Sequence, residues 1–138
     1  MASFVKFNCF VEDLAEKVHN LGSDTLKVAL TNSAPSASNT VLADITQISN
    51  GNGYTTGGTA ATISSSAQTS GTYKLVLADV TFTASGSMGP FRYVVLYNDT
   101  STSDSLIGYY DYGSSITLAS GETFTVDFDA TAGVLTLA

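Results

Sequence analysis

The feature that most constrains the fold of this chain is a change of hydrophobic period near residue 25. Before it, one segment has the apolar spacing of a helix. After it, apolar residues alternate in short runs of strand length, separated by turn residues. Short strands with turn signals about every 8 to 12 residues are typical of an antiparallel sandwich or barrel. We therefore predict a single mainly β domain over residues 1–138, with an N-terminal arm and helix over 1–22 and strands over 25–138.

The N-terminal segment has one apolar face and one charged face. This spacing predicts an amphipathic helix over residues 8–21. Asn8 is the expected N-cap, and Gly22 is expected to end the helix in a left-handed conformation. The residues predicted to be buried lie on the apolar face: Phe10, Leu14 and Val18.

The predicted strands have alternating apolar residues and end at Gly, Pro, Asn or Ser. They cover residues 25–32, 71–85, 91–98, 106–113, 115–119, 122–130 and 133–138. Residues 40–66 are punctuated by glycine and are predicted to be rich in loops. Residues 119–122 and 129–133 are predicted hairpin connections, each with a glycine at a position of positive φ.

The segment 91–98 is predicted to be a central strand, because both of its faces are apolar in the middle. Strict alternation places four of its residues on one face: Phe91, Tyr93, Val95 and Tyr97. Arg92 lies near the start of the strand, where its head can reach solvent. It either pairs with an aspartate at the strand end or anchors a contact with another chain.

Charge and cysteine content exclude several classes of function. The chain has 12 acidic and 5 basic residues and a net charge of -7, which argues against direct nucleic-acid binding. Cys9 is the only cysteine, so neither an internal disulfide nor a cysteine-based zinc site is expected. The first twenty residues lack the pattern of a signal peptide, and no apolar run has the length of a membrane helix. We expect synthesis in a cytoplasm and no membrane partner.

Three groups of side chains are candidates for chemistry. His19 has no nucleophile motif around it and is predicted to lie on the surface, and Cys9 is predicted to be a small buried residue. Asp127 and Asp129 alternate with apolar residues and so share one face, where paired carboxylates could serve acid/base chemistry or bind a cation. No calcium-loop spacing accompanies them. The sequence therefore predicts no catalytic residue, no cofactor and no metal site.

Four residues are the candidates for an interface with another protein. Arg and Tyr are enriched at the hot spots of protein–protein interfaces. The candidates come from the two most aromatic segments: Arg92, Tyr109, Tyr110 and Tyr112.

Several segments resemble small structural proteins of tailed bacteriophages. They include "FNCFVEDLAEKVHNLGSDTLKVALTNSAP", "TYKLVLADVTFTASG", "MGPFRYVVLYNDTSTSDSLIGYYDYGSSITLASGETFTVDF" and the terminal "GVLTLA". Within that group the chain is most similar to capsid cement or decoration proteins. The resemblance implies a jelly-roll-like antiparallel β-sandwich on the capsid exterior of the virion. It also implies a non-enzymatic role in which the protein clamps neighbouring subunits of the major capsid protein, with self-association as a homodimer or homotrimer.

Two other functions stay open on the sequence alone. A tail or fibre component that binds a receptor would expose Tyr109, Tyr110 and Tyr112 together. A small-ligand or metal-binding β domain would need a concave pocket around Asp127 and Asp129.

Overall fold

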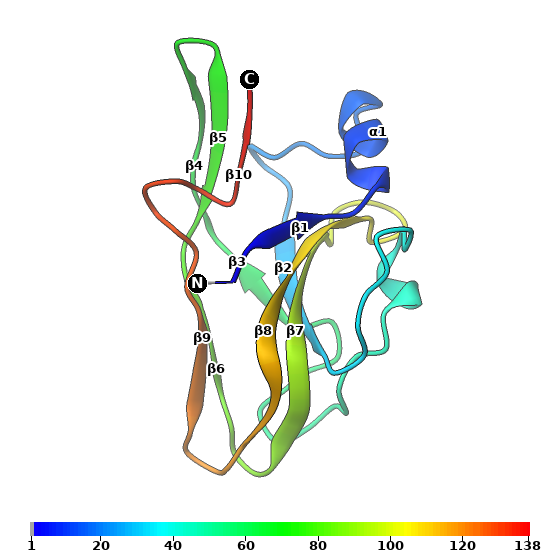
Figure 1. The fold of residues 1–138 in the computed structure, drawn as a ribbon, viewed down its shortest axis with the longest axis vertical. Helices are drawn as coiled ribbons and strands as arrows, with labels where there is room; N and C mark the ends of the chain where they lie inside the picture. Colours follow the sequence, from blue (N-terminus) through cyan, green and yellow to red (C-terminus); the bar gives the residue numbers. More distant parts are fainter. Residues whose placement is uncertain (1) are drawn as a thin grey trace.

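The computed structural model describes residues 2–138 and has a mainly β fold in which every sheet is antiparallel, as the alternating pattern predicts (Figure 1). The largest sheet has five strands in the order β1-β8-β7-β2-β3: Phe4–Lys6, Leu106–Leu118, Met88–Asn98, Leu26–Thr31 and Thr59–Ala61. A second sheet has the order β10-β5-β4: Leu135–Leu137, Thr72–Leu77 and Ile63–Thr69. The third pairs β6 with β9: Val80–Thr83 and Thr123–Val126. In Figure 1 the two smaller sheets follow one another along the long axis, beside the five-stranded sheet.

The N-terminal helix is much shorter than predicted. Helix α1 covers only Cys9–Ala15, and the chain leaves it at Lys17, which has a φ of 68°. The amide of Lys17 donates to the carbonyl of Leu14, and the next amide donates to Asp13, so a left-handed C-terminal motif ends the helix before Gly22 is reached. Asn8 occupies the N-cap position as predicted, but its side chain makes no capping hydrogen bond.

The early stop changes which residues of this segment are buried. Phe10 is buried as predicted, Leu14 is half-buried, and Val18 is 36% exposed, contrary to the prediction. Because the chain turns at Lys17, it is Leu21 that enters the core on the far side of the turn.

One hydrophobic cluster joins all three sheets. Its members come from facing strands and include Val28, Leu30, Leu75, Phe82, Leu96 and Val126. A smaller cluster lies on the opposite face of the five-stranded sheet and contains Phe7, Ala29, Ile45, Val95, Tyr97 and Leu106. Strand β7 contributes to both clusters and pairs with strands on both sides. This confirms the prediction of a central strand covered on both faces.

A shift of register near the start of β7 moves one side chain to the other face. Phe91 is opposite Ile116, but Tyr93 is opposite Asp111, so the ladder is irregular between them. As a result Phe91 packs in the large cluster with Val94, and the predicted grouping of Phe91 with Tyr93 is wrong.

Strands that are consecutive in the sequence often belong to different sheets. The segment 71–85, predicted as one strand, is divided into β5 and β6 at Ala78 and Asp79. Gly121 and Gly133 have the positive φ values predicted, 87° and 78°. The segments containing them do not form hairpins, however, because β8, β9 and β10 lie in three different sheets.

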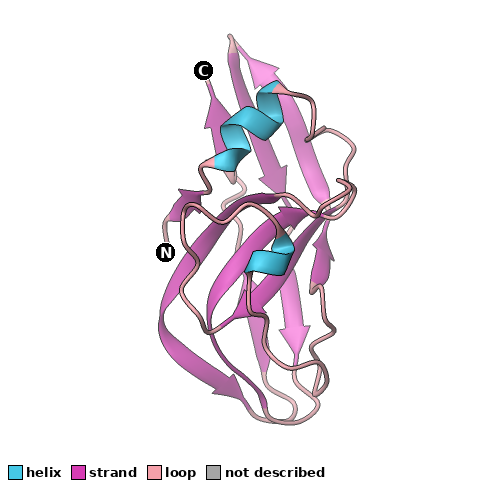
Figure 2. Cartoon of the chain, turned by 90° about the vertical axis from the view of Figure 1, so that its right-hand side faces the viewer, coloured by secondary structure: helices cyan, strands magenta, loops and turns pink. Residues whose placement is uncertain are grey.

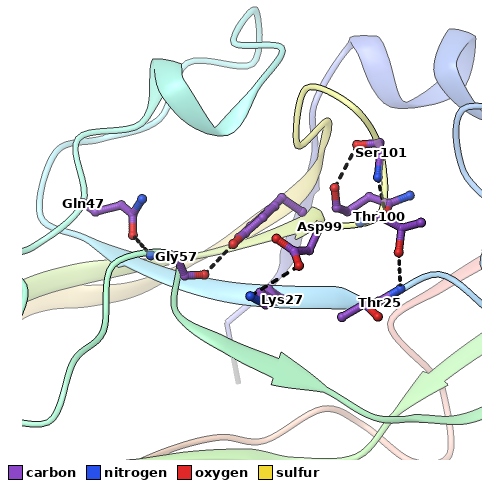
Figure 3. A network of polar contacts seen from close by, with 9 residues as sticks. Thr25, Lys27, Gln47, Gly57, Asp99, Thr100 and Ser101 are labelled. Atoms are coloured by element: carbon purple, nitrogen blue, oxygen red, sulfur yellow. Dashed lines mark hydrogen bonds and ion pairs between the residues drawn. The ribbon is translucent and has the colours of Figure 1, made fainter.

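The connection between β2 and β3 includes the 3₁₀ helix η1 (Leu42–Asp44), and in Figure 2 both helical segments lie in front of the strands. Polar contacts bind this connection and the β7–β8 turn to the sheet (Figure 3). The hydroxyl of Tyr97 in β7 donates to the carbonyl of Gly57 at 2.5 Å, and the Gly57 amide in turn donates to Gln47 at 2.7 Å. The Thr25 amide, just before β2, donates to the hydroxyl of Thr100 at 2.8 Å. No helix within residues 2–138 is long and apolar enough to cross a membrane.

Candidate functional site

Arg92 pairs with Asp111 across strands β7 and β8. Its Nε donates to Oδ1 at 2.8 Å and its Nη2 donates to Oδ2 at 3.1 Å, so the contact is bidentate. Oδ1 also accepts from the amide of Gly113 at 2.8 Å, which fixes the carboxylate. The two side chains are 38% and 42% exposed, and the pair is therefore open to solvent while each partner is held in place by the other.

Two tyrosines extend this pair into a surface. The guanidinium carbon of Arg92 lies 5.5 Å from the ring centre of Tyr93, whose ring meets that of Tyr109 edge-on at 6.4 Å. Tyr109 packs in turn on the buried ring of Phe7 at 5.3 Å. We call Arg92, Tyr93, Tyr109 and Asp111 the Arg92 surface. All four are half-exposed, so the rings present area to solvent from a backbone fixed in the largest sheet.

Arg92 and Asp111 each stabilise the charged form of the other. The hydrogen bonds to Asp111 raise the pKa of Arg92. Those from Arg92, followed by the one from Gly113, lower the pKa of Asp111 below its usual value. Both groups are charged throughout the physiological range, so the surface offers a neutralised ion pair beside two phenol rings. Such a combination suits a partner surface with both apolar and hydrogen-bonding groups.

The structure does not bring all four interface candidates together. Tyr110 lies on the opposite face from Tyr109, against Phe4 at 5.6 Å and Phe128 at 6.2 Å between ring centres. Burial raises its pKa to about 12. Tyr112, which is 53% exposed, packs on Phe124 at 5.5 Å. The grouping of three exposed tyrosines that a receptor-binding tail component would present is therefore not formed.

Asp127 and Asp129 have separate environments. Asp127 is exposed and borders a pocket of about 150 Å³ beside Tyr110 and Tyr112. Asp129 accepts from the amides of Thr131 and Ala132, both at 2.8 Å, and these bonds lower its pKa. The pocket is smaller than the roughly 300 Å³ at which sites for small organic ligands begin. Among residues 2–138 no three His, Cys, Asp or Glu side chains are grouped so that they could hold a metal ion.

His19 is buried, contrary to its predicted surface position. It is 5% exposed, packs on the ring of Phe10 at 5.4 Å, and places Nδ1 3.0 Å from the amide nitrogen of Asn98. That nitrogen also donates to Asp24 at 2.7 Å. Burial lowers the pKa of His19, while the carboxylates of Asp13 and Asp24 oppose the shift.

Cys9 is half-buried, with its Sγ 3.7 to 3.8 Å from the carbonyl oxygens of Asn39, Thr40 and Leu106. Burial, followed by the charge of Asp13, raises the pKa of the thiol. The protonated form is favoured, and the site is poorly suited to a nucleophile.

The helix turn leaves an open cleft of about 560 Å³ next to His19. Its walls come from the loop after α1, the β4–β5 hairpin, the β7–β8 turn and the C-terminal strand, and include Val18, Tyr73, Thr100 and Leu137. The volume falls within the range of ligand sites. Neither Asp127 nor Asp129 lies on its walls, so it is not the pocket that the small-ligand alternative requires.

Comparison of the chain with protein-family models, with curated proteins and with solved structures found no match.

Two parts of the polar structure could not be assigned from the sequence. Asp111 follows two of the candidate tyrosines directly, but the ladder places it opposite Tyr93, and only the side-chain hydrogen bonds show that it pairs with Arg92. The contact of His19 with Asn98 joins residues 79 positions apart. Asn98 opens a turn in which the amides of Thr100 and Ser101 donate to its side-chain oxygen, but nothing near Asn98 in the sequence indicates His19 as its partner.

Proposed function

We propose that this protein is a non-enzymatic virion component. In this role it binds the outside of an icosahedral bacteriophage head and clamps neighbouring subunits of the major capsid protein. The observation that carries the proposal is the Arg92 surface, in which two half-exposed tyrosines and a fixed ion pair lie on the largest sheet. Aromatic and arginine side chains that are already ordered lose little freedom on docking, so they are effective anchors for a protein partner.

The finer fold assignment belongs to the same proposal. We infer a jelly-roll-like sandwich in which the five-stranded sheet forms one layer and the two smaller sheets form the other. The core shared among the three sheets supports this architecture. A stiff β scaffold suits a clamp, because a contact that bridges two subunits must keep its geometry under load.

The physical basis of the role is multivalency. Packaged double-stranded DNA presses outward because its phosphates repel one another at close spacing. One small domain adds a modest contact, but many copies that each bridge two subunits oppose the opening of the whole shell. Few exposed side chains are long and charged, since only 12% of residues are charged. Docking therefore orders few flexible side chains.

The first experiment counts copies of the protein per purified particle by quantitative gel densitometry. Hundreds of copies support a head protein, whereas a handful would favour a tail or fibre component. The second compares complete particles with particles lacking the protein. The latter should release DNA at a lower temperature, and purified protein added back should restore the difference, because it binds only the intact shell.

Two add-back variants test the surface itself. Arg92→Ala removes the ion pair of the Arg92 surface and should restore less heat resistance than wild type. Lys27→Ala is the matched control, because it removes another partly exposed ion pair of the same sheet, Lys27 with Asp99 at 3.3 Å. Particles without the protein that stay full and heat-resistant but fail to adsorb to cells would contradict the clamp.

A further inference from the structure

A long stretch of the chain without charged residues forms a free edge of two sheets. Residues 45–73 contain no Asp, Glu, Lys, Arg or His, in a chain with a net charge of -7. Strands β3 and β4 both lie within this stretch, and each is the last strand of its sheet. Only Thr62 separates them, so residues 59–69 form the edge of two sheets in succession.

This edge lacks the usual protection against pairing with another chain. Sheet edges are commonly made short, or carry lysine, proline or an inward-pointing charge. The other terminal strands of these sheets, β1, β3, β6, β9 and β10, have three or four residues each. Strand β4 has seven, ISSSAQT, with neither proline nor charge.

The hairpin geometry identifies the backbone groups that face outward. The β4–β5 turn has positive φ at both central residues, Ser70 (51°) and Gly71 (86°), which is the two-residue turn that closes on a hydrogen-bonded pair. That pair is Thr69 with Thr72. Because hydrogen-bonded pairs alternate along an antiparallel ladder, the N–H and C=O groups of Ser66 and Gln68 point away from β5.

We propose that β4 pairs antiparallel with β4 of a second copy of this chain across a twofold axis. The two three-stranded sheets would then join into one sheet of six strands. An antiparallel edge is complementary to itself about a twofold, so every copy carries both halves of the interface. Two copies that are each strongly acidic repel one another least where the approaching segments carry no charge. The small Ser, Ala and Thr side chains of this edge also lose little entropy on contact.

The inference makes specific the self-association that the resemblance to capsid decoration proteins implies, and in that respect it rests on the proposed function, but its test uses the purified protein alone. A failed test would leave the Arg92 surface and the clamp unaffected, and a failure of the clamp would leave this pairing intact.

Sedimentation equilibrium over micromolar to near-millimolar protein should show a reversible monomer–dimer equilibrium. Gln68→Pro removes the outward N–H at a position where an edge strand tolerates proline. It should raise the dimer dissociation constant about tenfold or more, because the symmetric interface loses that bond twice. Gln68→Ala is the matched control. It loses the same side-chain bond to the Gly71 amide but keeps the N–H, and should dimerise nearly as wild type.

A second pair of variants guards against a folding defect in Gln68→Pro. Ala67→Lys places a charge on the exposed outer side of β4 and should weaken the dimer, whereas Ser120→Lys in a distant exposed turn should not. Amide exchange of residues 63–69 should slow as protein concentration rises. A protein that stays monomeric, a dimer that tolerates both Gln68→Pro and Ala67→Lys, or exchange in β4 that is independent of concentration would each overturn the proposal.

Discussion

His19 accepts a hydrogen bond from Asn98, and the direction of that bond is fixed by its surroundings. The side-chain oxygen of Asn98 accepts from two backbone amides, so the atom 3.0 Å from His19 Nδ1 is the amide nitrogen, a donor. His19 must then be neutral with its proton on Nε2, a buried atom that has no hydrogen-bond partner among residues 2–138. Protonation would place two donors against each other.

This relationship predicts acid sensitivity. The pKa of His19 is lowered in the folded protein, so below the unfolded value of about 6.5 the unfolded chain binds more protons than the folded one. The contribution of neutral His19 to the free energy of unfolding should be complete above pH ~6.5. Below it, the loss should approach about 1.4 kcal/mol per pH unit until the folded pKa is reached. The opposing charges of Asp13 and Asp24 limit the width of this window.

Urea unfolding measured between about pH 5 and about pH 7.5, a range that contains the unfolded imidazole pKa of about 6.5, checks the effect. His19→Gln keeps a side-chain acceptor for Asn98 but does not titrate, so its stability should fall less steeply over the same range. Equal slopes for the two proteins would show that other groups cause the acid sensitivity.

Phe10→Ala should destabilise the domain by about 3 to 5 kcal/mol, because the ring is 2% exposed and packs in the main cluster. Val11→Ala is the control on the same helix, since Val11 is 51% exposed and should change stability little. Thermal unfolding of both variants distinguishes a packed helix from a loosely held one. Similar melting curves for the two would mean that α1 is not anchored to the core.

Gly58→Ala should be much more harmful than Gly71→Ala. Both glycines have positive φ, 77° and 86°, which costs an alanine about 1 kcal/mol. At Gly58 a β-carbon would also collide with the carbonyl of Val28, whereas at Gly71 it would meet nothing within 4 Å. We expect a total cost of about 2 to 4 kcal/mol at Gly58, from the two effects together. Chemical denaturation of both variants measures the difference, and equal losses would refute the close approach to β2.

Arg92→Ala should leave the isolated domain folded, with a melting temperature only a few degrees from wild type, because exposed ion pairs add little to stability. Its association with a partner should weaken. If the variant instead unfolds readily while assembly is unaffected, Arg92 acts within the fold and not at an interface.

Local sequence patterns predicted the features that depend on neighbouring residues alone, such as the two faces of a strand and the φ of a turn glycine. Alternation identified β7 as a two-sided central strand, and the glycines at 121 and 133 have the positive φ expected of them. Alternation could not show which sheet a strand joins. The segment 71–85 reads as one strand, yet it enters two sheets. Helical spacing likewise continued beyond Lys17, where tertiary contacts of His19 and Leu21 outweigh helix propensity.

The candidate site was predictable in its residue types more than in its arrangement. An aspartate partner for Arg92 was one of two alternatives, and the hydrogen bonds between β7 and β8 show that it is Asp111. Tyr109 and Tyr110 are adjacent in a strand, so their side chains point to opposite faces of the sheet. These two interface candidates therefore cannot belong to one surface. The burial of His19 depends on a contact with Asn98, 79 residues later in the chain, and the sequence around His19 gives no sign of it.

The pairing of β1 with β8 has a consequence for biosynthesis. Phe4 lies beside Tyr110, so a strand at the start of the chain is completed by residues synthesised more than a hundred positions later. Strand β2 likewise waits for β7, and β6 for β9. Such distant pairings slow folding, because long loops must close before the contacts that reward them can form. On the ribosome, the N-terminal segment must therefore remain without its partner strand until most of the polypeptide has emerged, and during that interval it is available to chaperones.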